Sequence, residues 1–351
     1  MKPQQFGRQI STTRSIPAPV GGLNAVDSIA QMPETDAVVL DNMVAQPSNV
    51  QLRAGYVNWK TGFSGFVESL LPYANVSGEK LFAASGTAFY DATSSGAIGS
   101  AVVSGLTNAR WESTNIATPA GQYMYAMNGV DKPEFYDGTN WVAVDSGSTP
   151  AITGVTTTEL RNPVVWKNRL WAVETATLNA WYLPVQSIGG AASKWDLTSI
   201  FSEGGELRAI IPVSIATASD FDDYLAFITT EGQIAIYSGT DPATAGLFVI
   251  QGVYKIGKPI GRRCFFKAGA DAIIICSDGL VSLGNLVRQG RGKKTETISY
   301  KIQAALNADI QSYGTQFGWQ CVLHPLGTKS IMCVPGVPDS PSYQYVQSTI
   351  N

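Results

Sequence analysis

The stretch Asp223–Gly239, DYLAFITTEGQIAIYSG, contains two strand candidates joined by a turn. Apolar side chains recur at every second position in both halves, as they do when one face of a strand packs into a core. The alternating positions are Tyr224, Ala226, Ile228, Ile234 and Ile236. Between the halves, the pair Glu231-Gly232 provides the positive φ angle that a tight hairpin turn requires. The stretch therefore predicts an antiparallel β-hairpin.

This hairpin pattern recurs along the chain at a spacing of about 50 residues, which is typical of the blades of a propeller. The other copies are KLFAASGTAFYDAT from Lys80, QYMYAMNGVDKPEFYDG from Gln122, RLWAVETATLNAWYLPV from Arg169, DAIIICSDGLVSLG from Asp271 and KSIMCVPGVPDSPSYQYV from Lys329. The turn pairs in three of them are Ser85-Gly86, Asn128-Gly129 and Asp278-Gly279.

Each hairpin is preceded by another strand candidate, and most are followed by a fourth. The preceding candidates are VESLLPYA, RWESTNIAT, NPVVWKN, LRAIIPVSI, RRCFFKAG and GWQCVLHP. Two of the following candidates are SKWDLTSIF and FVIQGVYKIG. Four antiparallel strands repeated around an axis predict an all-β protein, a β-propeller of about six four-stranded blades. We expect the propeller to occupy residues 61–351, after an extended docking arm over 1–20 and an N-terminal segment over 21–60.

The end of the ring poses a problem, because the sixth copy stops after its third strand and would leave an exposed strand edge. The segment NVQLRAGYVNW, residues 49–59, is a strand candidate outside the six copies. We expect the strand around Val50–Trp59 to pair with the sixth blade and close the ring.

One segment between the fifth and sixth copies has helical rather than strand periodicity. Its apolar positions on one helical face are Ile298, Ile302, Ala305, Leu306 and Ile310. Thr297 or Ser299 is a candidate cap at its start, and Gly314 a candidate end. We therefore predict one inserted helix near residues 299–312.

Basic residues gather at two places. The loop before the predicted helix holds Arg288, Arg291, Lys293 and Lys294 among glycines, and we expect either a solvated loop or a contact with DNA phosphates or an acidic partner. The arm over residues 1–20 carries Lys2, Arg8 and Arg14 and no acidic residue. With few apolar residues, this arm is expected to become ordered only by docking on a partner.

The composition argues against several classes of protein. Charged residues make up 15% of the chain, below the usual share of about 25%. The formal net charge of −3 argues against a basic surface that coats nucleic acid. The basic N-terminus is followed by no apolar run, so we expect no signal peptide, and no apolar stretch is long enough for a membrane span.

Candidate metal or cofactor sites are lacking in the sequence. The single histidine, His324, precedes Pro325 and is expected in a turn, and the four cysteines form no CxxC pair. Without a signal peptide the cysteines are expected to be buried free thiols, although two pairs fall across predicted hairpins, where disulfides are conceivable. These pairs are Cys264 with Cys276 and Cys321 with Cys333. The pair Gly21-Gly22 lacks the flanking residues of a phosphate-binding loop and is interpreted as a turn. We expect no metal and no cofactor.

The N-terminal segment carries a family resemblance. PVGGLNAVDSIAQMPETDAVVLDNMVAQPSNVQLRAGY, Pro19–Tyr56, resembles the N-terminal segment of the tail nozzle proteins of short-tailed, podovirus-type bacteriophages, also called packaged-DNA stabilisation or tail tubular proteins. The shared pattern is Gly-Gly-Leu-Asn, then Asp-Ser, then Pro-x-x-Asp-Ala-Val-x-Leu-Asp-Asn, then Val-x-Leu-Arg-x-Gly-Tyr. The propeller hairpins and the helix ISYKIQAALNADI also fit the layout of that family.

This resemblance implies a structural protein of the virion, made in the host cytoplasm, and not an enzyme. It implies a homohexameric ring that lies below the tail adaptor ring, continues the DNA channel, and retains the packaged double-stranded DNA until genome ejection. Other tail proteins, such as fibres or a needle, would be further partners. Family members usually extend past the point where this sequence ends, so a distal tip domain is either missing or supplied by another chain.

The alternative is a propeller that binds or hydrolyses glycans. A glycosidase needs two carboxylates separated by about 5–9 Å, and propellers place acidic residues around their central channel. The candidate acids are Glu112, Glu174, Glu206, Asp222 and Asp223. They form no recognisable motif.

Overall fold

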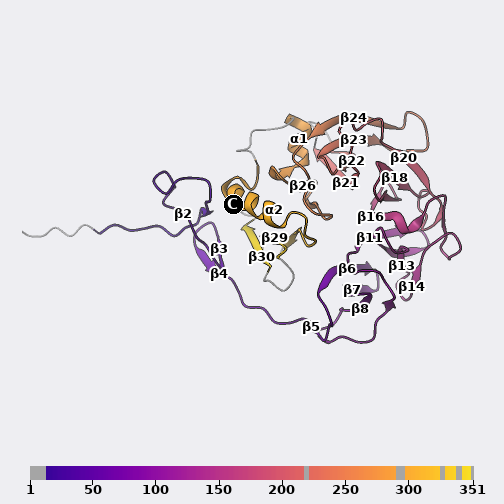
Figure 1. Cartoon of the computed structure of the whole chain (residues 1–351), viewed down its shortest axis with the longest axis horizontal. Coiled ribbons are helices and arrows are strands. Elements are labelled where there is room, and N and C mark those ends of the chain that lie inside the picture. Colours follow the sequence, from indigo (N-terminus) through magenta and orange to yellow (C-terminus); the bar gives the residue numbers. More distant parts are fainter. Residues whose placement is uncertain (1–12, 217–220, 290–296, 325–328, 337–341, 349–351) are drawn as a thin grey trace, which may run out of the picture.

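The computed structural model describes residues 13–216, 221–289, 297–324, 329–336 and 342–348. The chain forms a six-bladed β-propeller, as the repeats predict, with the N-terminal segment beside the ring (Figure 1). The first four blades have four strands each, in the order of the sequence from the axis outwards.

The strands of blade 1 are β6 (Val67–Asn75), β7 (Gly78–Ser85), β8 (Ala88–Asp91) and β10 (Val103–Ser104). Those of blade 2 are β11 (Glu112–Thr118), β12 (Gly121–Met127), β13 (Glu134–Tyr136) and β14 (Trp141–Ala143). Those of blade 3 are β16 (Leu160–Trp166), β17 (Arg169–Glu174), β18 (Asn179–Tyr182) and β20 (Ser193–Asp196). Those of blade 4 are β21 (Leu207–Ala216), β22 (Phe221–Thr229), β23 (Gln233–Gly239) and β24 (Phe248–Lys255).

The last two blades differ from the prediction, because each has three strands in the described part of the chain. The strands of blade 5 are β25 (Phe265–Ala268), β26 (Asp271–Cys276) and β27 (Gly279–Ser282). Those of blade 6 are β28 (Gln320–His324), β29 (Lys329–Val334) and β30 (Tyr343–Ser348). His324 therefore ends a strand rather than lying in a turn.

Short two-residue and three-residue strands lie outside the blades. They are β1 (Gly22–Leu23), β2 (Asp36–Ala37), β3 (Met43–Ala45), β4 (Val50–Leu52), β5 (Lys60–Thr61), β9 (Gly96–Ala97), β15 (Ile152–Thr153) and β19 (Gly190–Ala191). A 3₁₀ turn, Thr157–Glu159, precedes blade 3.

Hydrophobic clusters lie at the junctions between successive blades. In blade 4, Ala226, Ile228 and Ile236 pack toward blade 5, while Leu225 and Phe227 pack toward blade 3. This division matches the alternation in the sequence. Five such clusters cover the junctions from blade 1 to blade 6, and among the described residues none of them joins blade 6 to blade 1. The closure of the ring therefore needs a different explanation.

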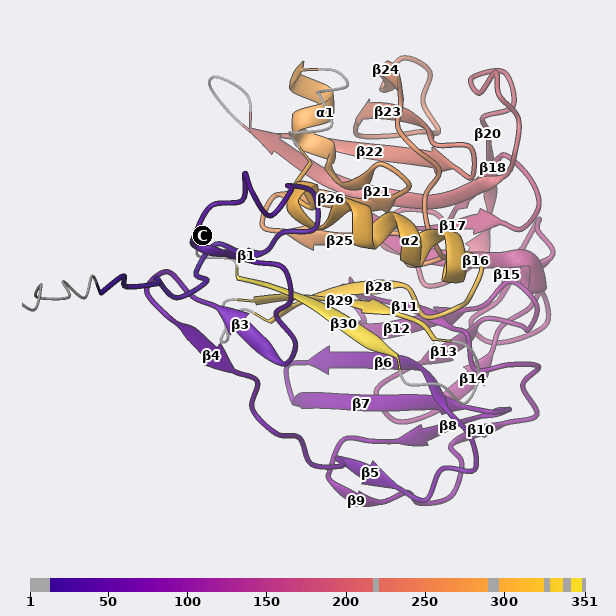
Figure 2. The ribbon, with the colours of Figure 1, turned by 60° about the vertical axis from the view of Figure 1, so that its left-hand side comes forward.

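The prediction that the strand around Val50–Trp59 pairs with blade 6 and closes the ring was wrong. β4 is only Val50–Leu52, and it pairs antiparallel with β3 instead of with blade 6. The tight turn between them is closed by a hydrogen bond of 2.8 Å from the main-chain amide of Gln46 to the main-chain oxygen of Asn49. A local hairpin closes a much shorter loop than pairing with β30 would, so its entropic cost is lower. Figure 2 shows the β3–β4 hairpin beside β30, which β3 contacts.

The N-terminal segment is attached to the 3₁₀ turn Tyr300–Ile302. The Ala25 amide donates to the Lys301 oxygen, 2.8 Å, and the Lys301 ammonium group contacts both the Asp36 carboxylate and the Gly21 oxygen at 3.0 Å. Gly21 lies in a turn, as predicted for the pair Gly21-Gly22, whereas Gly22 begins β1. The main-chain amides of the two glycines donate within the segment, to Thr35 and Pro19, so they are not free to bind a phosphate.

The predicted helix is confirmed, and a second one was missed. α2 (Gln303–Tyr313) follows the 3₁₀ turn directly, but Ser299 donates to the Gln303 side chain and accepts from the Leu280 amide instead of capping the helix. α1 (Leu283–Gln289) packs on blade 5, with two leucines of its first turn buried. Seven residues are too few for a clear helical period, which explains why the sequence did not predict α1.

All four cysteines are free thiols, as expected. Cys264, Cys276 and Cys321 are buried, and burial raises the pKa of each to about 12, whereas Cys333 is partly exposed. Thiols with raised pKa values are poor nucleophiles, so their role in this fold is packing.

Candidate functional site

The innermost strand of every blade carries one long polar side chain at, or just before, its first residues. These side chains are Glu68, Glu112, Arg161, Arg208, Arg263 and Gln320, in the order of blades 1 to 6. Because the repeated blades place equivalent positions at equal distance from the axis, these residues form a ring at one end of the innermost strands.

Irregularities in three innermost strands coincide with this position. The register of β6 shifts at Glu68, that of β21 shifts at Arg208, and that of β16 shifts between Arg161 and Val164. In the last case Asn162 has a left-handed φ of 50°. β-Bulges bend a strand and turn a side chain away from its regular direction. Here they occur where polar side chains have to leave the apolar junctions between blades.

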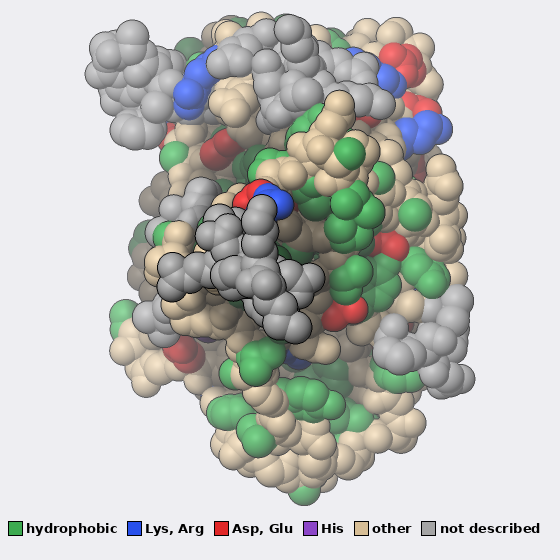
Figure 3. All heavy atoms as spheres, turned by 90° about the vertical axis from the view of Figure 1, so that its left-hand side faces the viewer, with side chains coloured by type: hydrophobic (Ala, Val, Ile, Leu, Met, Phe, Trp, Pro, Cys, Tyr) green, Lys and Arg blue, Asp and Glu red, His purple; other side chains and the backbone are tan. Residues whose placement is uncertain are grey.

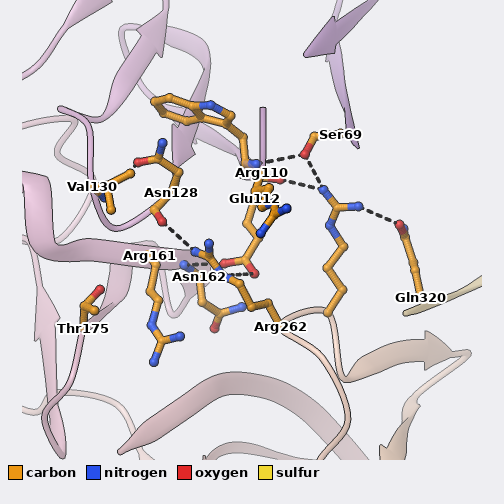
Figure 4. A network of polar contacts seen from close by, with 12 residues as sticks. Ser69, Arg110, Glu112, Asn128, Val130, Arg161, Asn162, Thr175, Arg262 and Gln320 are labelled. Carbon is orange, nitrogen blue, oxygen red and sulfur yellow. Dashed lines mark hydrogen bonds and ion pairs between the residues drawn. The ribbon is translucent and has the colours of Figure 1, made fainter. Parts of the chain in front are cut away.

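Glu112 of blade 2 connects three blades. Its Oε2 accepts a hydrogen bond from the Asn162 amide of blade 3, 2.8 Å, and its Oε1 lies 3.6 Å from Nε of Arg262, which precedes blade 5. Arg262 also donates to the main-chain oxygen of Asn128 in blade 2, 2.8 Å (Figure 4). Blades 2 and 5 are on opposite sides of a six-bladed ring, so these contacts cross the axis.

Arg263 connects four blades. Its guanidinium donates to the Ser69 hydroxyl of blade 1, 2.6 Å, to the Trp111 oxygen just before blade 2, 2.8 Å, and to the Gln320 amide oxygen of blade 6, 3.0 Å (Figure 4). The ring of Phe317, just before blade 6, lies 5.1 Å from the guanidinium carbon of Arg263. This side chain joins blade 6 to blade 1, where no hydrophobic cluster does so among the described residues.

The side chains of blades 3 and 4 extend the same network. Arg161, which is 6% exposed, donates to the Leu207 oxygen, 2.9 Å, and forms an ion pair with Glu206, 3.0 Å. The Arg208 side chain has no hydrogen-bond or ion-pair partner among the described residues, and its Nε is buried. We call Glu112, Arg161, Arg208, Arg262 and Arg263 the axial cluster.

Electrostatics within the axial cluster are dominated by burial. Burial lowers the pKa of Arg262 most, Glu112 raises it, and the neighbouring Arg161 and Arg208 lower it. Burial also lowers the pKa of Arg263, with Glu112 again opposing the shift. The arginines are therefore crowded together, and carboxylates only partly balance their charge.

Only some of the basic residues that were predicted to contact DNA or a partner lie in the described part of the chain. Arg288 is exposed on α1, whereas Arg291, Lys293 and Lys294 lie outside the described residues. In the arm, Arg14 forms an exposed ion pair with Glu34, and Lys2 and Arg8 lie outside the described residues.

The candidate glycosidase acids do not form one site. Glu112 and Glu206 reach the axis, where each is bonded to an arginine. Glu174 instead accepts a hydrogen bond from Asn179, 2.6 Å. Asp223 pairs with Lys167, 2.5 Å, and that hydrogen bond is the main reason why its pKa is lowered. The side chain of the fifth candidate, Asp222, lies outside the described residues.

Asp223 belongs to a small polar pocket between blades 3, 4 and 5. The pocket has a volume of about 180 Å³, and Lys167, Lys267 and Ser214 contribute polar groups to its wall. The Ser214 hydroxyl donates to Asp223, 2.7 Å, so the carboxylate already has partners on both sides. Among the described residues, the wall of the pocket contains no second carboxylate.

The described residues contain neither a metal-binding cluster nor a membrane-spanning helix. No group of three or more histidine, cysteine, aspartate or glutamate residues is placed to hold a metal ion in the described ranges. Within the same ranges, the helices are too short or too polar to cross a membrane.

Sequence reasoning missed the axial cluster, although a signal was present. When the six preceding strands are aligned, each long polar residue is followed by a small or short one. The pairs are Glu68-Ser69, Glu112-Ser113, Arg161-Asn162, Arg208-Ala209, Arg263-Cys264 and Gln320-Cys321. A polar position repeated once per blade would have predicted a polar ring around the axis.

No protein-family model matches the chain. No curated protein matches it either. Among solved structures, the periplasmic gluconolactonase PpgL of Pseudomonas aeruginosa is 15% identical, with a TM-score of 0.40 over 64% of this chain and 68% of that one. The BBS1N structure in complex with ARL6DN is 10% identical, with a TM-score of 0.38 over 62% of this chain and 64% of that one. The Swd1 β-propeller domain of Myceliophteria thermophila is 9% identical, with a TM-score of 0.35 over 82% and 99%. Likenesses at this level assign no activity, ligand or partner.

Proposed function

We propose that this protein is a structural component of a bacteriophage tail, a nozzle ring that continues the DNA channel below the adaptor. In this role it helps to retain the packaged genome and lets the DNA pass during ejection. Its partners are further copies of itself, six by family resemblance, the tail adaptor ring, other tail proteins such as fibres or a needle, and the packaged double-stranded DNA. Its place is the virion, after synthesis in the host cytoplasm.

The observation that carries this proposal is the surface of the N-terminal segment. The stretch Pro19–Tyr56, which resembles the nozzle proteins, leaves large apolar side chains in solvent. They include Ile29, Val39, Leu52 and Tyr56, which are 69–83% exposed. Figure 3 shows several groups of hydrophobic side chains on the face of the molecule that carries this segment. Large apolar side chains exposed close together in one segment are typical of a surface that is covered by a partner.

The axial cluster favours an arrangement in which each subunit forms part of the channel wall and does not itself contain the channel. Arg262 reaches from blade 5 to blade 2, so side chains cross the axis of the single propeller. A DNA duplex would have no passage along that axis. We infer that the channel runs between copies, with each propeller acting as a rigid block in its wall.

Electron microscopy of purified protein, alone and mixed with its adaptor ring, tests this proposal. We expect closed rings around a central pore, and loss of the rings when Leu52 and Tyr56 are both replaced by Ser. The matched control replaces Val76, which is exposed on the propeller turn between β6 and β7, by Ser. Single, unassociated propellers in every mixture would contradict the proposal.

A glycan-binding or glycan-hydrolysing propeller receives less support. An acid that protonates a glycosidic oxygen usually lies in an apolar pocket away from cations. The two carboxylates near the axis, Glu112 and Glu206, instead each contact an arginine. We therefore also propose that the protein is not an enzyme; hydrolysis of bacterial surface glycans by the purified protein would contradict this.

A further inference from the structure

Arg208 is the residue of the axial cluster that has no hydrogen-bond or ion-pair partner among the described residues. It lies at the bulge of β21, next to the ion pair of Arg161 with Glu206. Its side chain is only half-buried, so this end of the cluster opens to solvent. Its Nε is nevertheless inaccessible and bonds to no acceptor among the described residues.

Arg161 also has an unused donor. Its Nε atom is buried and has no hydrogen-bond acceptor among the described residues, whereas the buried Nε of Arg262 lies 3.6 Å from Oε1 of Glu112. A buried donor without an acceptor is destabilising, and more so when the group is charged. The two unpaired Nε groups of Arg161 and Arg208 therefore need a compensating group.

The excess positive charge of the cluster indicates that this compensating group is an anion. Two of the four arginines in the cluster form ion pairs, Arg161 with Glu206 and Arg262 with Glu112, while the nearby Glu68 forms its ion pair with Arg110. Two positive charges are thus left without an acidic partner in the cluster. Like charges that are crowded in a region of reduced dielectric repel one another strongly unless an anion lies between them.

Arg263 is an example, in the same cluster, of an arginine whose role is to join the blades. It too forms no ion pair among the described residues, although burial lowers its pKa and Glu112 and Glu68 oppose that shift, and its donors bond to the neutral oxygens of Ser69, Trp111 and Gln320. In the described part of the chain, Arg208 has no such acceptors. The difference between these two residues indicates that the open end of the cluster is built for a ligand rather than for packing.

We propose that Arg208, with Arg161 and Arg262, forms a binding site for a phosphate-class oxyanion at the open end of the propeller axis. Guanidinium groups match the oxygens of phosphate through paired N–H donors, and several of them can share one tetrahedral anion. The ligand is either free inorganic phosphate or the phosphodiester of a nucleic acid strand. This inference does not depend on the proposed role in a phage tail.

Thermal unfolding in phosphate tests the site. Inorganic phosphate is titrated at constant ionic strength, with sodium chloride as the balancing salt. We expect the midpoint of the wild-type protein to rise with phosphate, because a ligand that binds only the folded state stabilises it. Arg208→Gln should raise the apparent Kd at least tenfold, whereas the exposed control Arg53→Gln should leave it unchanged.

A second arm distinguishes the two sources of phosphate. A short oligodeoxythymidine is titrated by fluorescence anisotropy against wild type and Arg208→Gln. Binding that is lost in the variant assigns the site to a phosphodiester, and binding of phosphate alone assigns it to the free anion. Circular dichroism verifies folding, and Arg208→Lys, which keeps the charge but loses the planar fork, should bind with intermediate affinity.

Two results would overturn the proposal. One is a wild-type midpoint that responds equally to phosphate and to chloride at matched ionic strength. The other is a phosphate response that Arg208→Gln and Arg53→Gln share with wild type, which would mean that the anion binds elsewhere.

Discussion

The guanidinium of Arg263 donates a hydrogen bond to the main-chain oxygen of Trp111 across 2.8 Å, although 152 residues separate the two in the sequence. Through this contact and its bonds to blades 1 and 6, one side chain connects the start and the end of the ring. The propeller thus closes through a polar network at the axis, where a shared strand was expected.

Replacing Arg263 should therefore destabilise the whole ring. Arg263→Met removes the guanidinium donors of the buried Trp111 oxygen and of Ser69, whose hydroxyl keeps its bonds to Trp111 and Ala109. We expect a loss of about 1.5–3 kcal/mol in the free energy of unfolding, because hydrogen bonds from a charged donor to buried acceptors are lost. Urea unfolding measures it, with the exposed Arg53→Met as a control that should change by less than about 0.5 kcal/mol. A loss below about 1 kcal/mol would mean that other contacts close the ring.

Glu112 and Arg262 should be energetically coupled. Glu112→Gln keeps an oxygen for the Asn162 amide but removes the charge that balances Arg262, so we expect a loss of about 2–4 kcal/mol. The double variant Glu112→Gln with Arg262→Met should be less destabilised than the sum of the single variants. A double-mutant cycle measures this coupling, and strict additivity would argue against it.

Glu134 should make stability depend on pH. Its side chain is buried on β13, and burial is the main cause that raises its pKa from 4.5 to about 7. The folded state therefore holds the proton more tightly than the unfolded chain does. The contribution of Glu134 to the free energy of unfolding is therefore fully present below pH 4.5. It is lost as the pH rises through about 7, and above that pH it no longer changes.

Glu134→Gln should consequently raise the unfolding midpoint at pH 8 and flatten the curve between pH 5 and 7. A shift of this size corresponds to at most about 3 kcal/mol. Thermal unfolding from pH 5 to 8.5 measures the effect, with the exposed Glu79→Gln as control. Parallel curves for wild type and Glu134→Gln would refute the assignment.

The attachment of the N-terminal segment should depend on Gly21. A Cβ atom added at Gly21 would lie 1.9 Å from Asp36 Oδ1, and Asp36 is the residue that Lys301 holds. We expect Gly21→Ala to release the segment over residues 13–45 and to increase its cleavage by thermolysin, which cuts before apolar residues such as Leu23 and Ile29. The unfolding midpoint of the propeller should change little. Gly55→Ala, where an added Cβ meets open space, should be cleaved like wild type. Equal cleavage of both variants would exclude this role of Gly21.

The basic loop requires a test in the assembled particle. Replacing Arg288, Arg291, Lys293 and Lys294 together by Ser should weaken genome retention if the loop contacts DNA. The defect should then depend on salt, since each lost phosphate contact lowers the salt slope by about one. If the loop contacts a protein partner, assembly should fail first. Variant particles that assemble, retain DNA under salt challenge and infect normally would leave the loop as solvated surface.

The arm gives a prediction of its own. We expect residues 1–20 to be cleaved readily in the isolated subunit and to be protected in the assembled tail. Limited proteolysis of both samples, with a downstream site as internal standard, measures the difference. Equal cleavage would remove the docking role.

The sequence predicted what depends on local chemistry. The hairpins follow from alternation and from Xaa-Gly turns such as Glu231-Gly232, whose glycine has a φ of +86°. The helix α2 follows from its apolar face. The three-stranded blades 5 and 6 and the hairpin of β3 with β4 were not predicted, because a strand candidate does not specify its pairing partner.

The axial cluster could not be located from any residue alone. In the sequence, an arginine next to an apolar strand, such as Arg263, is equally typical of a solvent-exposed strand end. Its role arises only when blades far apart in the chain meet, since its acceptors belong to blades 1, 2 and 6. Comparison of the six copies at one position would have indicated the ring, but not which arginines are bonded and which are free.

The order of strands within the described blades has an evolutionary consequence. Each blade takes its strands from one uninterrupted stretch of chain. Duplication or loss of such a stretch in a gene would therefore insert or remove a whole blade without changing the pairing of any other. The side chains at the centre would then have to adapt to the new number of blades. A change in the number of blades would therefore also require a change in the charged side chains that join the blades at the axis.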